Sequence, residues 1–238
     1  MSSVENLELH GDCRHCPLHK DGRFCDLSEA AALRLNAVKF STAYPKGATL
    51  FLEGDEPRGV FIMCVGKAKL TTSSFDGKTL ITKITEPGEI LGASATILGV
   101  PYEISAETIE PSQVSFVRGT DFLALLKNYP DACLRAARQV SAKYHDAQRE
   151  VRTFGLAHTT SEKLARLILG WAAGGQKTAR GVRIEVLLTH EEIGQMLGAT
   201  RETVTRLLGN WKRDHIIDVN GANVYLTGPA ALEAMVNC

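Results

Sequence analysis

The sequence predicts an α+β protein in which an N-terminal antiparallel β-roll (a double-stranded β-helix) precedes a long helix and a C-terminal winged helix-turn-helix. Three observations support this prediction. Short β-rich runs alternate with turn signals over residues 40–117, a heptad stripe of apolar residues follows, and two short helical patterns near the C-terminus flank a Gly-containing turn. At 238 residues, the chain has room for one large domain or two modest ones.

The composition excludes several classes of protein. Hydrophobic residues make up 44% and charged residues 23% of the chain, an ordinary globular mixture. Lys+Arg and Asp+Glu both number 27, so only a local basic patch would favour nucleic acid. The longest purely apolar run, Val60–Val65, is far shorter than the roughly 20 residues of a membrane span. The first residues lack the pattern of a signal peptide, so we expect a cytoplasmic protein without a membrane partner.

The N-terminal segment, residues 1–27, carries half of the six cysteines. Cys13 and Cys16 have the C-x-x-C spacing that lets two thiolates reach one metal, and Cys25 follows after a loop that contains a turn signal. Clustered thiols in a reducing compartment bind metal or sense redox state more often than they form disulfides. A metal site is therefore predicted, with reversible thiol chemistry or free thiols as alternatives. The candidates for a fourth ligand are Asp12, Asp26, His15, His19, Cys64 and Cys133.

Residues 28–130 are predicted to form the β-roll. A helix is expected from Leu27 to Val38, with Ser28 as its N-cap. Several β-rich runs then recur at a spacing of about 8–12 residues, which is typical of an antiparallel sandwich or barrel. Asp76-Gly77, between two such runs, predicts a hairpin.

Residues 131–157 are predicted to form the long helix, after a short helix over residues 122–128 that ends before Tyr129-Pro130. Apolar side chains repeat along it at alternating spacings of three and four, as in a coiled coil. This stripe suits either a helix packed on its own domain or a two-stranded coiled coil, which would make the protein a homodimer. Its members are Ala137, Val140, Tyr144, Ala147, Val151 and Phe154.

Residues 158–238 are predicted to form the winged helix-turn-helix. A helix over residues 161–173 is stopped by Gly174-Gly175, and a strand is expected over residues 182–188. Thr189 and Glu192 match a capping box that opens the next helix. After the turn at residues 198–200, Thr200 caps a second helix with a core face of Val204, Leu207, Leu208 and Trp211.

The second of these helices carries side chains suited to the major groove. Arginine offers two donors to the guanine O6 and N7 atoms, and glutamate accepts from the cytosine N4 amino group. From Thr200 to Arg213 there are four basic residues and one acidic residue, although the net charge of the whole chain is zero. The alternative is a solvated face held by a Glu202–Arg206 pair. We predict contact with double-stranded DNA through Thr189, Thr200, Arg201, Glu202, Thr205, Arg206 and Lys212.

No enzymatic motif accompanies this pattern. His190-Glu191-Glu192 begins like the zinc-protease motif H-E-x-x-H, but the position of its second histidine is occupied by Gly194. The sequence also has no phosphate-binding loop and no nucleophile elbow. We therefore expect a protein that is not an enzyme.

The order of roll, heptad helix and terminal helix-turn-helix resembles the bacterial CRP/FNR family of transcription regulators over about residues 28–238. The segment LTHEEIGQMLGATRETVTRLLGNW is very similar to the DNA-reading segment of that family. Arg201, Glu202 and Arg206 reproduce the R-E-x-x-x-R pattern of its cAMP-binding branch, and the resemblance implies TGTGA-like half-sites in an inverted repeat. It also implies that Thr159-Thr160 and the hairpin at Asp76-Gly77 contact RNA polymerase. The roll resembles the family in Gly47, Glu53-Gly54-Asp55, Gly66, Pro87-Gly88-Glu89 and Gly92.

The effector pocket implied by the resemblance is degenerate. The cAMP-binding branch holds the ribose with a glutamate after the pocket glycine and the cyclic phosphate with an Arg-Ser pair. Here Ala93 follows Gly92, and Ile104 precedes Ser105. A buried phosphate without its cationic partner is costly, so no tight cAMP binding is expected.

The cysteines are instead similar to those of the oxygen-sensing FNR branch, in which three N-terminal cysteines and one cysteine of the roll hold a [4Fe–4S] cluster. The resemblance implies such a cluster on Cys13, Cys16 and Cys25. The position of the fourth family cysteine matches Ser115, so Asp26, Asp12 or Cys64 would complete the set. A cluster would make the protein a redox or oxygen sensor, whereas zinc or reversible thiol chemistry would make it a different kind of switch.

Overall fold

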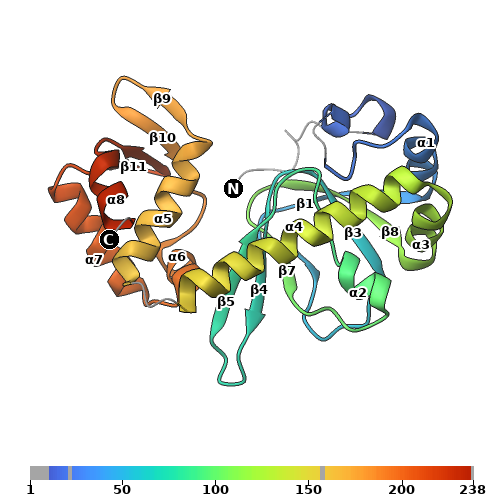
Figure 1. The fold of residues 1–238 in the computed structure, drawn as a ribbon, viewed down its shortest axis with the longest axis horizontal. Coiled ribbons are helices and arrows are strands. Elements are labelled where there is room, and N and C mark those ends of the chain that lie inside the picture. Colours follow the sequence, from blue (N-terminus) through green and yellow to red (C-terminus); the bar gives the residue numbers. More distant parts are fainter. Residues whose placement is uncertain (1–10, 21–22, 156–158, 237–238) are drawn as a thin grey trace. The chain divides into compact units, whose positions relative to one another are not determined.

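The computed structural model describes residues 11–20, 23–155 and 159–236 (Figure 1). The chain divides into two compact units, Met1–Arg149 and Glu150–Cys238. Each unit has its own hydrophobic core. Within the described residues, no helix combines the length and the apolarity that crossing a bilayer requires.

The N-terminal segment is folded against the first unit. Two short 3-10 helices, η2 (Cys13–His15) and η3 (Pro17–Lys20), precede helix α1 (Glu29–Val38). Ser28 caps α1 by accepting a hydrogen bond from the backbone N–H of Ala31, which confirms the predicted helix start. The side chain of Phe24 is only 1% exposed and packs beside the ring of Phe122. Phe24, next to Cys25, is therefore part of the core, and Cys13 and Cys25 pack against it.

The roll consists of two four-stranded antiparallel sheets, with strand orders β1-β8-β3-β6 and β2-β7-β4-β5. Their strands are β1 (Lys39–Tyr44), β2 (Thr49–Phe51), β3 (Gly59–Val65), β4 (Ala68–Ser73), β5 (Thr79–Ile84), β6 (Ile90–Leu91), β7 (Ser105–Thr108) and β8 (Ser112–Arg118). The hairpin predicted at Asp76-Gly77 joins β4 to β5. Helix α2 (Ala93–Leu98), which the sequence did not indicate, begins after Gly92, and α3 (Gly119–Asn128) follows β8.

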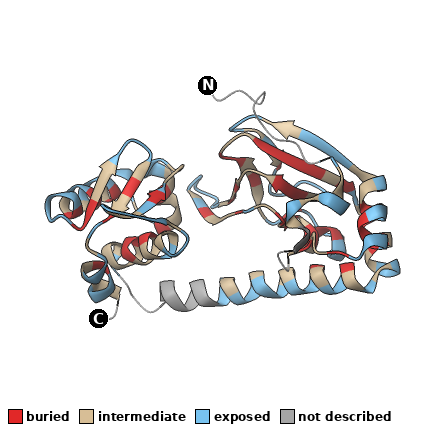
Figure 2. Ribbon diagram, turned by 90° about the horizontal axis from the view of Figure 1, so that it is seen from above, coloured by how far each residue is buried: buried red, intermediate tan, exposed pale blue. Residues whose placement is uncertain are grey.

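Helix α4 (Pro130–Gly155) contacts the roll along one face only (Figure 2). Ala132 and Ala136 are buried in the core that includes Phe24. Of the predicted heptad stripe, Val140 is half-buried against that core, whereas Ala137, Tyr144 and Ala147 are exposed; the side chain of Tyr144 is 63% exposed. The side chains of two further stripe residues lie outside the described part of the helix; these are Val151 and Phe154.

The second unit is a helix-turn-helix with a small sheet of order β11-β12-β10-β9. Its elements are α5 (Thr160–Ala173), β9 (Gln176–Thr178), β10 (Gly181–Glu185), α6 (His190–Leu197), α7 (Arg201–Arg213), β11 (Ile217–Asn220), β12 (Asn223–Leu226) and α8 (Pro229–Val236). The predicted strand over residues 182–188 is too long: pairing with β12 stops at Glu185. The α+β fold of roll, long helix and winged helix-turn-helix is confirmed.

Candidate functional site

Local sequence fixes the geometry of the helix-turn-helix. Thr189 and Glu192 form the predicted capping box: the Thr189 hydroxyl accepts from the backbone N–H of Glu192, and the Glu192 carboxylate accepts from that of Thr189. Gly198 ends α6 in the left-handed region with a φ of 64°. A Cβ atom at Gly194 would stand 2.6 Å from the Ala199 carbonyl oxygen, so only glycine lets the turn fold this closely against α6.

Helix α7 presents its polar face away from the core of the second unit. Val204, Leu208 and Trp211 are buried beneath it. All seven side chains predicted to contact DNA are exposed, and four of them lie in the first two turns of α7. The seven are Thr189, Thr200, Arg201, Glu202, Thr205, Arg206 and Lys212.

The start of α7 also sets the charge of Glu202. Hydrogen bonds from its own backbone N–H and from the Thr200 hydroxyl hold the pKa of the Glu202 carboxyl below its usual value. The side chain is therefore an ionised acceptor at neutral pH, flanked by the cation of Arg201. An exposed face that alternates guanidinium donors with a carboxylate acceptor is suited to reading G·C pairs.

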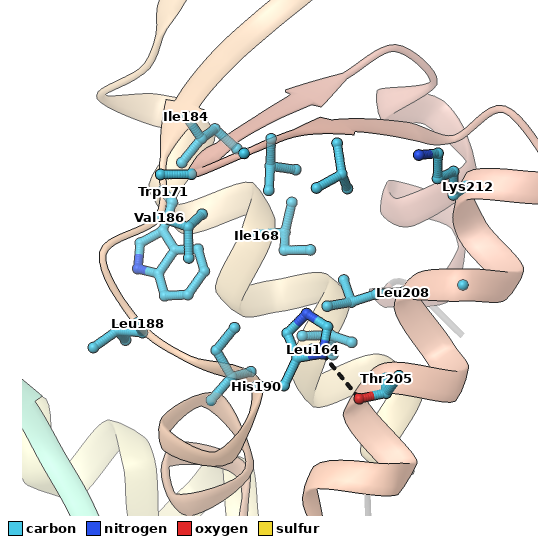
Figure 3. A pocket seen from close by; sticks show the side chains of 16 residues that line it. Leu164, Ile168, Trp171, Ile184, Val186, Leu188, His190, Thr205, Leu208 and Lys212 are labelled. Atoms are coloured by element: carbon cyan, nitrogen blue, oxygen red, sulfur yellow. Dashed lines mark hydrogen bonds between the residues drawn. The ribbon is translucent and has the colours of Figure 1, made fainter.

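A feature that the sequence did not reveal joins the two helices. His190 Nδ1 lies 2.9 Å from Thr205 Oγ1, a hydrogen bond between the first turn of α6 and the middle of α7 (Figure 3). Both side chains border a mainly apolar cavity of about 340 Å³, together with Lys212. The hydroxyl of Thr205, one of the predicted DNA contacts, is therefore engaged within the protein by His190.

The cysteines of the first unit gather around a second, much smaller cavity of about 20 Å³. Cys13, Cys16 and Cys25 reach it from the N-terminal segment, and Cys64 reaches it from β3. The ammonium of Lys39 lies 3.2 Å from Cys13 Sγ. Among the described residues, no three His, Cys, Asp or Glu side chains are already positioned to hold a metal ion. The four thiols therefore line one cavity, but their sulfur atoms do not have the geometry of a metal site.

Comparisons with known proteins agree with this architecture. Residues 41–129 match the cyclic nucleotide-binding domain, and residues 162–235 match the Crp-like helix-turn-helix domain. The chain belongs to the CRP/FNR family of transcription regulators. Membership of this family also makes it a regulator and not an enzyme, as predicted.

The known relatives are distant in sequence and similar in fold. The cAMP-activated global transcriptional regulator CRP of Pasteurella multocida is 23% identical, over 78% of this chain and 88% of the relative. The transcriptional regulatory protein btr of Bordetella pertussis is 27% identical, over 97% of this chain and 96% of the relative. The structure of FixK2 from Bradyrhizobium japonicum superposes with a TM-score of 0.73 at 20% identity, over 83% of this chain and 97% of that chain.

In this CRP/FNR regulator, the region that matches the effector pocket is occupied by its own side chains. The rings of Phe51 and Tyr102 lie 4.3 Å apart, and Tyr102 donates a hydrogen bond to the Gly59 carbonyl oxygen. Ala93 is buried, and Ile104 packs against the same aromatic cluster. Gly92, another residue of the predicted effector pocket, is also closely packed. A Cβ atom there would lie 2.6 Å from the ring of Tyr102. Apolar contacts thus replace the ion pairs that a cyclic phosphate needs.

Ser105, the polar residue of the predicted effector pocket, is hydrogen-bonded within the protein. The hydroxyl of Ser105 accepts a hydrogen bond from the backbone N–H of Glu53 at 2.9 Å. The carboxylate of Glu53 in turn accepts from the Thr72 hydroxyl and the Ser73 backbone, both at 3.0 Å. The Ser105 hydroxyl and the Glu53 carboxylate are thus both engaged in hydrogen bonds within the protein.

The candidates for a fourth ligand beside the three N-terminal cysteines differ in their surroundings. The carboxylate of Asp26 is paired with Arg135 of α4 and does not border the thiol cavity. Asp12 borders the cavity, but its carboxylate caps η2 and is paired with Arg14. Cys64 is buried and borders the cavity directly. Of the remaining candidates, His15 is exposed, Cys133 is exposed on α4, and the side chain of His19 lies outside the described residues.

Burial disfavours the thiolate form of three of these cysteines. Desolvation raises the pKa of Cys13, Cys25 and Cys64 above the ordinary thiol value, and Lys39 only partly offsets this effect. Since the thiolate is the nucleophile, these side chains are poor partners for simple thiol exchange at neutral pH.

Proposed function

We propose that this CRP/FNR regulator acts in the cytoplasm as a homodimer that reads TGTGA-like inverted repeats. One observation carries the proposal: Arg201, Glu202 and Arg206 stand together, exposed, on the first two turns of α7. Two guanidinium groups and one ionised carboxylate complement the donors and acceptors of G·C pairs in the major groove. A two-fold dimer places two such helices about one turn of DNA apart.

The outward face of α4 supports the dimer. Tyr144, Ala137 and Ala147 are exposed although they belong to the apolar stripe of a helix whose other face packs on the roll. A second copy of the same stripe would bury these side chains in a two-stranded coiled coil.

The proposed input is a redox, oxygen or other small-molecule signal and not cAMP. The aromatic cluster around Tyr102 and the apolar Ala93 and Ile104 support this proposal, because apolar side chains stand where a cyclic nucleotide would need charged and polar partners. The cysteine cavity is the natural entry point for such a signal, and an iron–sulfur cluster is its proposed cofactor.

The proposed output passes through RNA polymerase. The hairpin between β4 and β5 projects Phe75 fully into solvent beside Asp76, and Thr159 lies exposed at the start of α5. Such exposed side chains suit contact with a second protein.

The function is tested by replacing one reading residue. Arg206→Ala is expected to weaken binding to a TGTGA inverted repeat by about 1–3 kcal/mol, roughly 5- to 150-fold in Kd, and to relax base choice at one position. Fluorescence anisotropy with a labelled duplex and with single-base variants measures both effects. A change of equal size on a scrambled duplex would make Arg206 a phosphate contact only, contrary to the proposal.

Lys127→Ala is the matched control, since Lys127 is an exposed cation on α3 of the sensor unit. It removes the same charge from the chain without touching α7, so the affinity for both duplexes should stay at the wild-type value.

A further inference from the structure

We propose that Cys64 is the fourth thiolate of a metal centre formed with Cys13, Cys16 and Cys25. The inference deepens the proposed function and rests on it, because it names the site through which the signal would enter. Four thiolates select a thiophilic metal, either zinc or the iron of an iron–sulfur cluster.

The first support is the way in which distant segments meet at one cavity. Cys13 is held by η2, where its backbone N–H donates to the Asn36 side chain at 3.3 Å. Cys25 follows the buried Phe24 and packs against the same core. Cys64 lies on β3, a central strand of its sheet. All four thiols, Cys16 included, border the cavity of about 20 Å³. Small rotations of these side chains would close them around a metal, since a preformed site is rarely complete before binding.

The second support is that the competing carboxylates are already engaged. Arg135 binds Asp26 twice, through the carboxylate and through the backbone carbonyl oxygen at 3.0 Å. Arg14 binds both carboxylate oxygens of Asp12, at 2.6–3.1 Å. Using either acid as a ligand would sacrifice a charge-assisted pair. Cys64 can be recruited without such a loss.

The third support is the hydrogen bonding of Ser115. Its hydroxyl lies 3.2 Å from Cys64 Sγ and 2.8 Å from the hydroxyl of Ser41. A thiolate can only accept, so in the metal-bound form Ser115 would donate to Cys64 and Ser41 would donate to Ser115. Ser115 lies on β8, the strand that pairs with β3, and would orient the Cys64 thiolate from outside the metal shell.

The fourth support is the charge balance. Four thiolates around a divalent metal leave a net negative charge, and Lys39 Nζ lies 3.2 Å from Cys13 Sγ. This ammonium borders the same cavity and offsets part of that charge, as outer-shell donors to sulfur do in metal sites.

The geometry also shows how occupancy would reach the dimer helix. In the sheet, Ile62 of β3 pairs with Ile90 of β6. The backbone N–H of Ile90 donates to Gln139 of α4 at 3.1 Å, and its carbonyl oxygen accepts from Lys143 at 2.8 Å. On the other side, Asp26 adjoins Cys25 and is held by Arg135 of the same helix. The strand that carries Cys64 and the segment that carries Cys25 are thus each connected to α4 through neighbouring residues.

The test is metal content in full-length protein purified without oxygen, and again after reconstitution with ferrous iron plus sulfide or with zinc sulfate. Iron, sulfide and zinc are assayed per protomer, and the visible spectrum is recorded before and after exposure to air. Wild-type protein is expected to hold one centre per protomer, and Cys64→Ser to hold it about tenfold less. Cys133→Ser is the matched control and should retain it, because Cys133 is exposed on α4 and does not border the cavity. An air-sensitive iron and sulfide centre identifies a cluster, whereas zinc alone identifies a tetrathiolate ion. In either case, loss of that centre in Cys64→Ser supports the assignment of Cys64.

The assignment is overturned if Cys64→Ser keeps the wild-type metal content, or if wild-type protein takes up neither metal. Circular dichroism and DNA-binding anisotropy on the same samples separate loss of metal from loss of folding. Serine differs from cysteine by one heavy atom, so Cys64→Ser is a small change. A second variant, Cys64→Ala, must show the same loss of metal as Cys64→Ser. Because DNA affinity is read independently, a protein that takes up neither metal but still binds the TGTGA repeat refutes this inference and leaves the reading function intact.

Discussion

The two units of this regulator obtain their functional residues in opposite ways. In the second unit, the capping box at Thr189, the turn at Gly198 and the reading residues of α7 all lie within residues 189–213. In the first unit, the thiol cavity joins Cys13 and Cys25 to Cys64 on a strand far along the chain. The proposed output site is therefore a local structure, whereas the proposed input site exists only after the roll has folded.

This difference explains why family resemblance transfers unequally. A local helix-turn-helix keeps its geometry whenever its short pattern of caps, turn and core residues is present. A site assembled from separate strands can exchange one ligand position for a neighbouring one, because the side chains of adjacent strands lie within a few ångströms of each other. The Cys64 thiol and the Ser115 hydroxyl illustrate such a pair, 3.2 Å apart.

The largest expected effect separates the two units. Trp211 is only 3% exposed in the core of the second unit, so Trp211→Ala should destabilise that unit by about 3–5 kcal/mol. Hydrogen exchange should increase throughout α6 and α7 while the roll keeps its protection. Trp171→Ala is the matched control, because Trp171 is only partly buried and borders the open cavity. Equal loss of protection in the roll would show that the units unfold together, and the comparison between them would fail.

A smaller effect distinguishes an ion pair from a metal ligand. Asp26→Ala removes the carboxylate that Arg135 binds and should lower the stability of the first unit by about 1–2 kcal/mol. Metal content should remain that of the wild type, since Asp26 does not border the thiol cavity. Chemical denaturation followed by iron and zinc assays checks both results. Loss of metal equal to that of Cys64→Ser would instead place Asp26 among the ligands.

A third prediction is a pH dependence that arises in the first unit. Burial lowers the pKa of Lys143 from 10.5 to about 8, with Glu89 opposing and Lys83 adding to the shift. Below pH 8 the ammonium is charged in the folded and the unfolded chain, and its full desolvation cost is present. Between pH 8 and 10.5 the folded chain loses the proton first, so stability should rise through this window relative to Lys143→Met. Thermal unfolding of both proteins from pH 7 to 10.5 measures the difference, and a constant difference would refute the lowered pKa.

Prediction from sequence succeeded where contacts are short-range. Ser28 and Thr189 cap helices as their patterns indicate, and the Asp76-Gly77 turn joins two paired strands. It was less successful at element ends: the strand after Gly181 stops at Glu185, because its partner β12 begins at Asn223. Helix α2 was not anticipated, since it has less than two turns in which to display a period.

The sequence by itself determined the order of the elements, the polar face of α7 and the apolar residue Ile104 next to Ser105. These properties follow from residue identity and from spacings of three or four positions, which a linear chain displays directly. Only the tertiary structure decided between Asp12, Asp26 and Cys64 as the proposed partner of the N-terminal cysteines, and only it revealed the hydrogen bond from His190 to Thr205. The physical reason is that a carboxylate, thiol, imidazole or hydroxyl can interact with many groups along the sequence. Packing of the roll and the helices leaves each of these side chains with one set of neighbours.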